Sequence, residues 1–263
     1  MIRAIIFDLD GTLVQSEKLK AQSYAIAAQR LRGLPEPAPR AVEAYRSIVG
    51  ATRDVASRHI METLDLEADL APLMDQYGAT EPVEVLSSMR KSIYDDMVAD
   101  PNLLRDNQWP HTVSLLRVAT ENFCRTGLAT MSHREEAMHV LRSLDLERSL
   151  DLVLTREDVR QGKPAPEIYL LAAERLDVAP EDCIVLEDSP TGVRAGVAAG
   201  MNVIAVATPF TVAGLHSSEI VNHTWIVHDS ESLPDAVQRR IDEHARTTHG
   251  TRHDDEVASD RED

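Results

Sequence analysis

The chain has 263 residues, of which 43% are apolar, and its 44 acidic residues against 27 basic ones give a formal net charge of -17. This length suffices for one large domain or two small ones with a sizeable core. The composition is that of a soluble globular protein. The negative charge argues against nucleic acid and anionic membranes as partners, because both require a basic footprint on the protein. A small phosphorylated substrate is still compatible, since it needs only local cations.

No segment approaches the ~18 uninterrupted apolar residues of a membrane span, and Met1 leads almost directly into the first apolar run, which leaves no room for a signal peptide. We therefore expect a cytoplasmic protein, and we favour a monomer. Cys124 and Cys183 each lie in an apolar, strand-like run. Buried free thiols are favoured there over a disulfide or a metal pair.

The first apolar run, residues 2–7, predicts a buried strand, because it is rich in branched residues, too short for a helix and soon stopped by Gly11. Two acids, Asp8 and Asp10, follow it. Side chains two positions apart on an extended backbone point to one side. Two carboxylates held close together away from water call for a bound cation or a shared proton. The alternative is a turn in which Asp10 and Gly11 merely end the strand.

The next segment indicates helices. A helix is predicted over residues 16–31 with Ser16 as its N-cap, and prolines close it. Residues 41–106 keep helical spacing throughout with no convincing strand, and residues 106–110 look like a return linker. A run of helices inserted between two strands is typical of a separate helical subdomain.

Strands and helices then alternate. Further strands are predicted over residues 124–130, 152–154, 183–186, 203–206 and 225–227. Four helices are predicted in this part of the chain. The first spans residues 112–122, and the second begins at a capping box formed by Ser132 and Glu135. The third begins at Pro166, and the fourth runs from Ser189 to Gly200. This alternation predicts an α/β fold, a doubly wound parallel sheet with helices on both faces.

The last residues have almost nothing to bury, so a disordered tail is predicted over 246–263. His249 and His253 lie in it, and a solvated role is favoured for them over metal binding. The predicted organisation is a core over residues 1–15 and 111–245, a helical unit over 16–110 and the acidic tail.

Four polar clusters fall at predicted strand ends or in the loops that follow them: Asp8 with Asp10, Thr130, Lys163, and Glu187 with Asp188. In doubly wound sheets the site lies at those carboxyl ends. Taken singly, each cluster has an ordinary explanation, such as a strand-end hydroxyl, a solvated loop cation or helix capping. Taken together, those explanations leave two anions at a buried strand end without partners.

These clusters carry a family resemblance. Four segments resemble the four motifs of the haloacid dehalogenase superfamily, and most of all its beta-phosphoglucomutase-like branch of phosphatases and mutases: Asp8-Leu9-Asp10-Gly11-Thr12, Leu128-Ala129-Thr130, Lys163-Pro164-Ala165-Pro166 and Leu186-Glu187-Asp188-Ser189-Pro190-Thr191-Gly192. The resemblance extends to about residue 240. It implies a Rossmann-like core with a helical cap domain inserted after the first motif.

The resemblance also implies roles for these residues. Asp8 would be the nucleophile that forms an aspartyl phosphate, and Asp10 would act as general acid and then base. Thr130 would bind the phosphoryl group, and Lys163 would offset its charge. The implied cofactor is Mg²⁺, held by carboxylates of Asp8, Glu187 and Asp188 together with the backbone carbonyl of Asp10.

The helical cap supplies candidate substrate-binding residues. The segment Gly50-Ala51-Thr52-Arg53 resembles the family's substrate-specificity loop, which makes Arg53 a candidate for binding a distal anion of the substrate. An exposed arginine at the start of a helix explains Arg53 equally well. Arg90, or its neighbour Lys91, matches a second cap position.

The chain departs from the family pattern near the first motif. Lys20 stands where the family often has histidine, and Gln15-Ser16 replaces the usual Asp-Thr or Asp-Ser. Lys20 is therefore a substrate-binding candidate whose role differs from the pattern, and Ser132 in the core is the last such candidate.

The predicted function is that of a Mg²⁺-dependent phosphatase, a phosphoric monoester hydrolase acting on a small phosphorylated metabolite, with sugar phosphates favoured. The alternative is a phosphosugar mutase. A catalytically inactive binding or regulatory protein on the same scaffold is disfavoured, because such a protein has no need of both Asp8 and Asp10. The family members that break C–Cl bonds lack the second aspartate, so Asp10 argues against dehalogenation.

Overall fold

The computed structural model describes residues 1–49, 51–121 and 124–259, and the chain forms two compact units. The first, here called the sheet unit, comprises Met1–Leu13, Trp109–Thr208 and Val212–Asp263. The second, the helical unit, comprises Val14–Gln108 and Pro209–Thr211. Residues 209–211 were expected in the core, but here they belong to the helical unit, where the Phe210 ring lies 6.5 Å from that of Tyr45.

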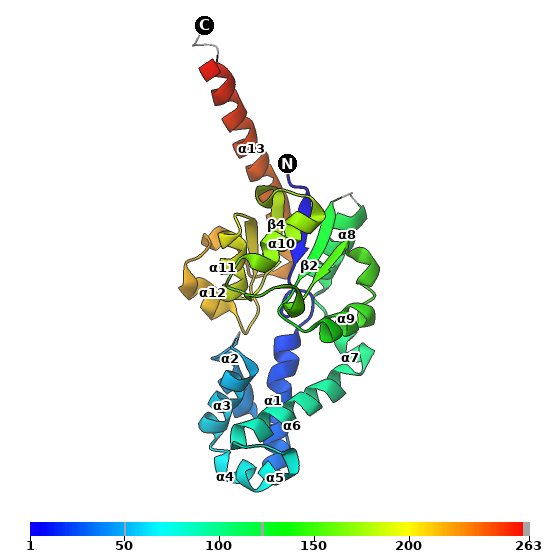
Figure 1. Cartoon of the computed structure of the whole chain (residues 1–263), viewed down its shortest axis with the longest axis vertical. Coiled ribbons are helices and arrows are strands. Elements are labelled where there is room, and N and C mark those ends of the chain that lie inside the picture. The colour runs from blue at the N-terminus through cyan, green and yellow to red at the C-terminus, as the bar shows by residue number, and fades with distance from the viewer. Residues whose placement is uncertain (50, 122–123, 260–263) are drawn as a thin grey trace. The chain divides into compact units, whose positions relative to one another are not determined.

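The sheet unit contains six parallel strands in the order β3-β2-β1-β4-β5-β6 (Figure 1). Their bounds are β1 Ala4–Phe7, β2 Arg125–Ala129, β3 Leu152–Leu154, β4 Cys183–Glu187, β5 Asn202–Val206 and β6 Ile226–Val227. All six predicted strands are present, which confirms the α/β prediction. β1 is central and wholly buried, as a strand covered on both faces must be, and this explains its unbroken apolar run.

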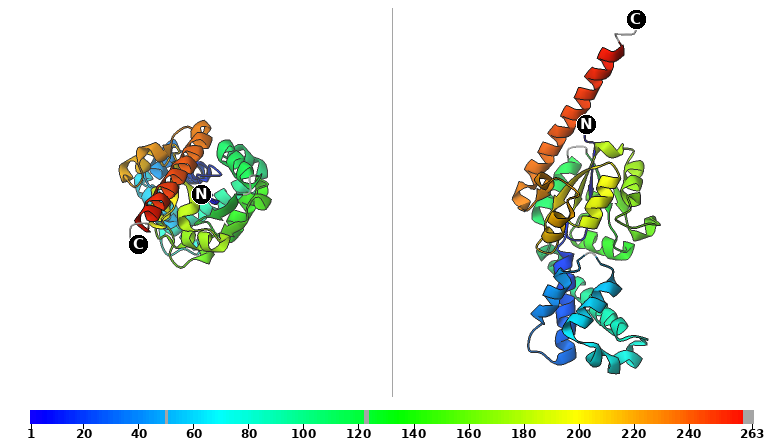
Figure 2. Two further views of the ribbon diagram at one scale, coloured as in Figure 1. Left: turned by 90° about the horizontal axis from the view of Figure 1, so that it is seen from above. Right: turned by 90° about the vertical axis from the view of Figure 1, so that its left-hand side faces the viewer.

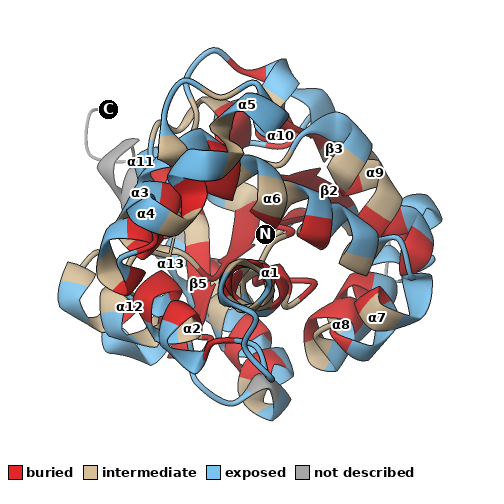
Figure 3. Ribbon diagram, turned by 90° about the horizontal axis from the view of Figure 1, so that it is seen from below, coloured by how far each residue is buried: buried red, intermediate tan, exposed pale blue. Residues whose placement is uncertain are grey.

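Helices cover both faces of this sheet (Figure 2). α10 (Glu167–Leu176) and α11 (Pro190–Ala198) pack on one face, and α8 (Pro110–Glu121) and α13 (Leu233–Ser259) pack on the other. α9 (Arg134–Ser143) and α12 (Val212–Ser218) complete the helices. Short 3-10 turns are η2 (Glu147–Ser149), η3 (Arg156–Asp158), η4 (Pro180–Asp182), η5 (His223–Trp225) and η6 (Ser230–Ser232). Figure 3 shows β2 and β5 largely in the colour of buried residues.

The helical unit contains α1 (Ser16–Arg32), α2 (Pro39–Arg46), α3 (Arg53–Leu64), α4 (Glu67–Leu70), η1 (Ala71–Leu73), α5 (Met74–Tyr77), α6 (Pro82–Val98) and α7 (Pro101–Asp106). It has its own hydrophobic core, in which Tyr24, Ile60 and Leu86 are almost completely buried. An isolated antiparallel bridge between Val14 and Gln108 joins the two ends of its main segment. No helix among the described residues has both the length and the apolar character needed to cross a membrane.

Two local predictions, both of helix caps, were wrong. Gln15, not Ser16, precedes α1, and no side-chain hydrogen bond caps that helix. His133, not Ser132, is the N-cap of α9, because the Ser132 hydroxyl is used elsewhere. The assigned bounds of α13 extend to Ser259, and residues 260–263 lie outside the described part. The disordered tail over residues 246–263 stays a prediction.

Candidate active site

The two central strands bring the predicted acids together. β1 and β4 pair in parallel with Phe7 opposite Leu186, so Asp8 and Glu187 follow at the same level. The backbone N–H of Asp8 donates to the carbonyl of Leu186 at 3.0 Å. Asp8, Glu187 and Asp188 are all buried. Residues far apart in the chain therefore converge at the carboxyl edge of the sheet, where the sequence pattern predicted them.

Lys163 lies at the centre of this group. Its Nζ donates to Asp8 Oδ1 at 2.7 Å, to Glu187 Oε1 at 2.5 Å and to the carbonyl of Ala129 at 2.9 Å. An ammonium group has three hydrogens to donate, and all three are used. The side chain is only 5% exposed. Lys163 is thus a fixed positive charge between two acids, and the structure rules out the alternative of a solvated loop cation.

Glu187 is held from several sides. The hydroxyl of Tyr169, on α10, donates to its Oε1 at 3.0 Å. Both the backbone N–H and the hydroxyl of Ser189 donate to its Oε2 at 3.0 Å. The Ser189 hydroxyl also accepts from the N–H of Gly192 at 3.1 Å, which confirms the predicted cap of α11. Glu187 is therefore oriented by its own cap motif and by a neighbouring helix.

Two glycines leave room for the acids. A Cβ on Gly11, whose φ is +82°, would lie 2.0 Å from Asp188 Oδ2. A Cβ on Gly192 would lie 1.7 Å from Glu187 Oε1. Neither position accepts a side chain unless a carboxylate moves. Steric crowding therefore explains why both positions are glycine.

Asp8, Glu187 and Asp188 fit a hard divalent cation. Each offers a carboxylate oxygen, and these oxygens lie within 4.8 Å of one another. Among the described residues they form the only such group of acids, cysteines and histidines. An all-oxygen donor set suits Mg²⁺.

The charge balance points the same way. Burial raises the pKa of Asp8 to about 8; the positive charge of Lys163 opposes this, and the charges of Glu187 and Asp10 add to it. For Lys163, burial acts to lower the pKa, but Asp8 and Glu187 together raise it well above its ordinary value. The ammonium thus stays charged while the carboxylates crowd one another. A bound cation would relieve that crowding.

Asp10, Thr130 and Ser132 are linked. The hydroxyl of Ser132 donates to Asp10 Oδ2, and the backbone N–H of Ser132 donates to Thr130 Oγ1 at 3.1 Å. Thr130 is completely buried at the end of β2. The Asp10 side chain is not part of the group of three acids, and its predicted role at the metal is through its backbone carbonyl.

The remaining candidates lie in the helical unit. Lys20 forms an ion pair with Glu17 at 2.9 Å, and Arg53 is exposed at the first position of α3. Arg90 is 6% exposed, and its guanidinium lies 4.8 Å from the ring centre of Tyr94. The Lys91 side chain is 43% exposed and pairs with Asp95, so Arg90 and Lys91 differ in environment. Gly50 lies outside the described residues. The substrate-binding roles of these side chains stay predictions.

Sequence reasoning missed Tyr169. Its ring centre lies 5.0 Å from Lys163 Nζ, and its hydroxyl binds Glu187. The available signal was a tyrosine on the apolar face of a predicted helix close after the lysine motif, since a buried tyrosine hydroxyl needs a partner.

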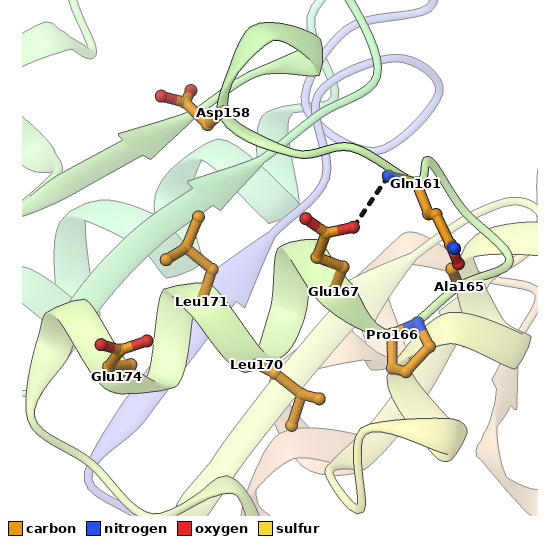
Figure 4. A pocket seen from close by; sticks show the side chains of 8 residues that line it. All are labelled: Asp158, Gln161, Ala165, Pro166, Glu167, Leu170, Leu171 and Glu174. Carbon is orange, nitrogen blue, oxygen red and sulfur yellow. Dashed lines mark hydrogen bonds between the residues drawn. The ribbon is translucent and has the colours of Figure 1, made fainter.

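A pocket of about 490 Å³ lies elsewhere on the sheet unit, along α10 (Figure 4). Its lining residues are Asp158, Gln161, Ala165, Pro166, Glu167, Leu170, Leu171 and Glu174. It contains none of the predicted site residues. Its charged side chains are all acidic, which makes it unsuitable for a phosphate group.

The geometry agrees with comparisons to known proteins. Residues 2–200 match the family model described as haloacid dehalogenase-like hydrolase. The chain is 31% identical over 201 residues to a phosphorylated carbohydrates phosphatase of Thermotoga maritima, covering 76% of this chain and 82% of the relative. It is also 31% identical over 225 residues to hexitol phosphatase A of Escherichia coli, covering 84% and 91%. The fold is similar to that of a beta-phosphoglucomutase from Clostridium difficile, with a TM-score of 0.63, 23% identity and coverage of 93% and 99%.

Proposed function

Because the chain belongs to the haloacid dehalogenase-like hydrolase family, we propose that it is a Mg²⁺-dependent phosphatase of small phosphorylated metabolites, with sugar phosphates as the favoured class. The observation that carries the proposal is the buried group in which Lys163 binds Asp8 and Glu187, with Asp188 beside them. The names of the two phosphatase relatives, for phosphorylated carbohydrates and a hexitol, support the substrate class.

In the proposed reaction, a carboxylate oxygen of Asp8 attacks phosphorus while the bond to the leaving oxygen breaks. Asp10 gives its proton to that oxygen, so the alcohol departs neutral and an aspartyl phosphate is left. Water then attacks the phosphorus, Asp10 takes a proton from it, and the Asp8 carboxylate is restored with release of phosphate. The hydrogen bond from Ser132 orients Asp10 for both steps.

Asp8, Glu187 and Asp188, with the carbonyl of Asp10, would hold Mg²⁺, which supplies positive charge opposite the phosphoryl oxygens. Thr130 and Lys163 add a hydroxyl donor and a fixed ammonium on the protein side. Lys163 also keeps Asp8 from rotating away, because it bonds to one of its oxygens. This arrangement leaves little for the protein to reorganise during the reaction.

A panel of phosphorylated metabolites, scored for released phosphate with Mg²⁺ and after chelation, tests the proposal. We expect turnover only with Mg²⁺ and its loss by orders of magnitude in Asp8→Asn, because an amide is not a nucleophile here. Asp95→Asn, in an exposed ion pair, is the matched control and should keep full turnover. Circular dichroism checks that both variants fold. Retained hydrolysis in Asp8→Asn would refute the aspartyl-phosphate mechanism, and Mg²⁺-independent turnover would refute the metal role.

A further inference from the structure

Three histidines from separate elements of the sheet unit converge beside the edge strand β6. His216 belongs to α12, His223 to η5, and His228 directly follows β6. Nδ1 of His216 lies 3.2 Å from Nδ1 of His223, and Nε2 of His216 lies 3.2 Å from Nε2 of His228. The imidazole rings of His216 and His228 are nearly parallel, at 5°, with centres 4.9 Å apart.

This cluster is open to solvent. His223 and His228 are exposed and His216 is partly exposed. None of the three belongs to the proposed phosphatase site, which uses residues that follow β1, β2 and β4 together with Lys163. A dissolved ion can therefore reach the histidines without passing the acidic group.

The two nitrogens of His216 are engaged differently from those of an ordinary surface histidine. A neutral imidazole has one N–H donor and one lone pair, and each His216 nitrogen faces a nitrogen of another histidine. If His216 Nδ1–H donates to His223, its Nε2 presents a lone pair toward His228. His228 Nε2 then either carries a proton and donates it to His216, or presents a second lone pair; in the second tautomer a cation between the two nitrogens removes their repulsion.

The separation of the two Nε2 atoms suits a metal ion. Nitrogen ligands bind Zn²⁺ at about 2.0–2.1 Å, so two of them on a tetrahedral ion lie about 3.3–3.4 Å apart. The 3.2 Å between His216 and His228 therefore requires little movement. Imidazole nitrogens favour zinc, copper and nickel, whereas Mg²⁺ favours oxygen ligands.

We propose that His216 and His228 form a binding site for a transition-metal cation, with Zn²⁺ as the type ion, through their Nε2 atoms. Water completes the coordination shell. His223 is a positioning residue: its Nδ1 accepts from His216 Nδ1–H and so fixes the tautomer that presents Nε2. The bound ion links α12 to the segment after β6 and stabilises that edge of the sheet.

The test is to titrate the full chain with Zn²⁺ in the presence of saturating Mg²⁺ and to measure binding by isothermal titration calorimetry. The melting temperature is the second readout. We expect one Zn²⁺ site and a rise in melting temperature. In His216→Asn and in His228→Asn, affinity at this site should fall at least tenfold and the rise in melting temperature should disappear. Circular dichroism without zinc checks that each variant folds.

The matched control is the double variant His249→Asn/His253→Asn, because those histidines are four positions apart in the sequence and do not belong to the cluster. It should retain the zinc site. Loss of binding in this control, or unchanged binding in His216→Asn and His228→Asn, would overturn the proposal.

His223 has its own test. His223→Leu removes the acceptor and should weaken zinc binding about 10-fold or more. His223→Asn places a carbonyl oxygen near the former Nδ1 position and should restore much of the affinity. Equal zinc affinity in His223→Leu and His223→Asn would refute the positioning role of His223. The zinc site formed by His216 and His228 is tested separately by the variants of those two residues.

Discussion

Gly11 allows the first motif to approach Asp188 closely. A glycine is favoured there for two reasons, its positive φ and the short distance to Asp188, and a pair of variants separates the two. In Gly11→Ala a Cβ would lie 2.0 Å from Asp188 Oδ2, at a φ of +82°. Gly78→Ala is the matched control, because its φ is +61° and nothing lies within 4 Å. We expect the control to lose about 1–2 kcal/mol of unfolding free energy from backbone strain and to keep its turnover.

Gly11→Ala should lose at least tenfold in turnover as well, since displacing Asp188 disturbs the proposed metal site. Phosphate release and urea unfolding measure the two effects. Equal turnover in the two variants would mean that the contact with Asp188 has no catalytic consequence.

Lys163 donates hydrogen bonds to both Asp8 and Glu187 in the acidic group. Lys163→Met would leave Asp8 and Glu187 buried without it. Removing one partner of a buried ion pair costs roughly 3–5 kcal/mol, so we expect a loss of that order in Mg²⁺-free urea unfolding.

Mg²⁺ should recover more stability in Lys163→Met than in the wild type, because the ion replaces part of the lost charge. Lys91→Met is the control: that side chain is 43% exposed and pairs with Asp95, and such surface pairs contribute about 1 kcal/mol or less. A variant as stable as this control without Mg²⁺ would contradict the electrostatic account.

The residues of the site were predictable to different degrees. Asp8 and Thr130 directly follow strands, and Glu187 is the last residue of one. Lys163 lies in the segment between β3 and α10. Strand ends in a parallel sheet meet at one edge, which is why these residues could be predicted to converge. Ser132 could not be placed by the same logic. Its spacing to Glu135 fits a capping box, but in the fold a tertiary hydrogen bond to Asp10 takes its hydroxyl instead.

At the scale of elements, α13 is fixed to the start of the chain through Asp182. His244 Nε2 lies 2.8 Å from Asp182 Oδ1, and the N-terminal amine lies 3.2 Å from the same oxygen. Partial burial acts to raise the pKa of Asp182, but hydrogen bonds from His244 and the N-terminal amine lower it below its ordinary 3.8. A lowered carboxyl pKa contributes stability above pH 3.8 and loses it as the pH falls through the folded value.

Asp182→Asn should therefore reduce unfolding free energy at pH 7 by about 1 kcal/mol, a modest figure because the group is partly exposed. The difference from the wild type should shrink as the pH falls below 3.8. Urea unfolding at a series of pH values measures this, with the exposed neighbour Glu181→Gln as the control. A difference that stays constant with pH would contradict the role of the charge.

The elements themselves were largely predictable where a period was clear. The six strands were located from short branched runs between turn signals, and the helical unit from sustained helical spacing. The place of residues 209–211 in the helical unit was not predictable, since no local pattern tells that a loop packs with a distant helical unit.

At the scale of the whole molecule, the open question between phosphatase and mutase concerns the fate of the aspartyl phosphate. A mutase must grip a distal phosphate firmly and keep water away, whereas a phosphatase must admit water. Arg53, Arg90 and Lys91 are the candidate cations for such a grip. Lys91 is committed to an exposed pair with Asp95, and Arg90 is buried against Tyr94. Lys20, in place of the usual histidine, also departs from the mutase pattern.

We therefore expect phosphate release to dominate. The measurement supplies beta-glucose 1-phosphate with a catalytic amount of glucose 1,6-bisphosphate and follows glucose 6-phosphate and free phosphate together. Isomerisation much faster than phosphate release would replace the phosphatase assignment with the mutase one.

The strands that pair in the sheet are synthesised at very different times. β1 carries Asp8 at its end and pairs with β2 and β4, but roughly 120 residues separate it from β2 and roughly 175 from β4. At about 5–20 residues per second, the ribosome needs roughly 6–24 seconds to produce the first of these partners. The main segment of the helical unit, Val14–Gln108, has been synthesised by then, and only residues 209–211 of that unit are still to come. A nascent chain thus carries most of the helical unit while β1, a strand that is wholly buried in the fold, has no strand to pair with.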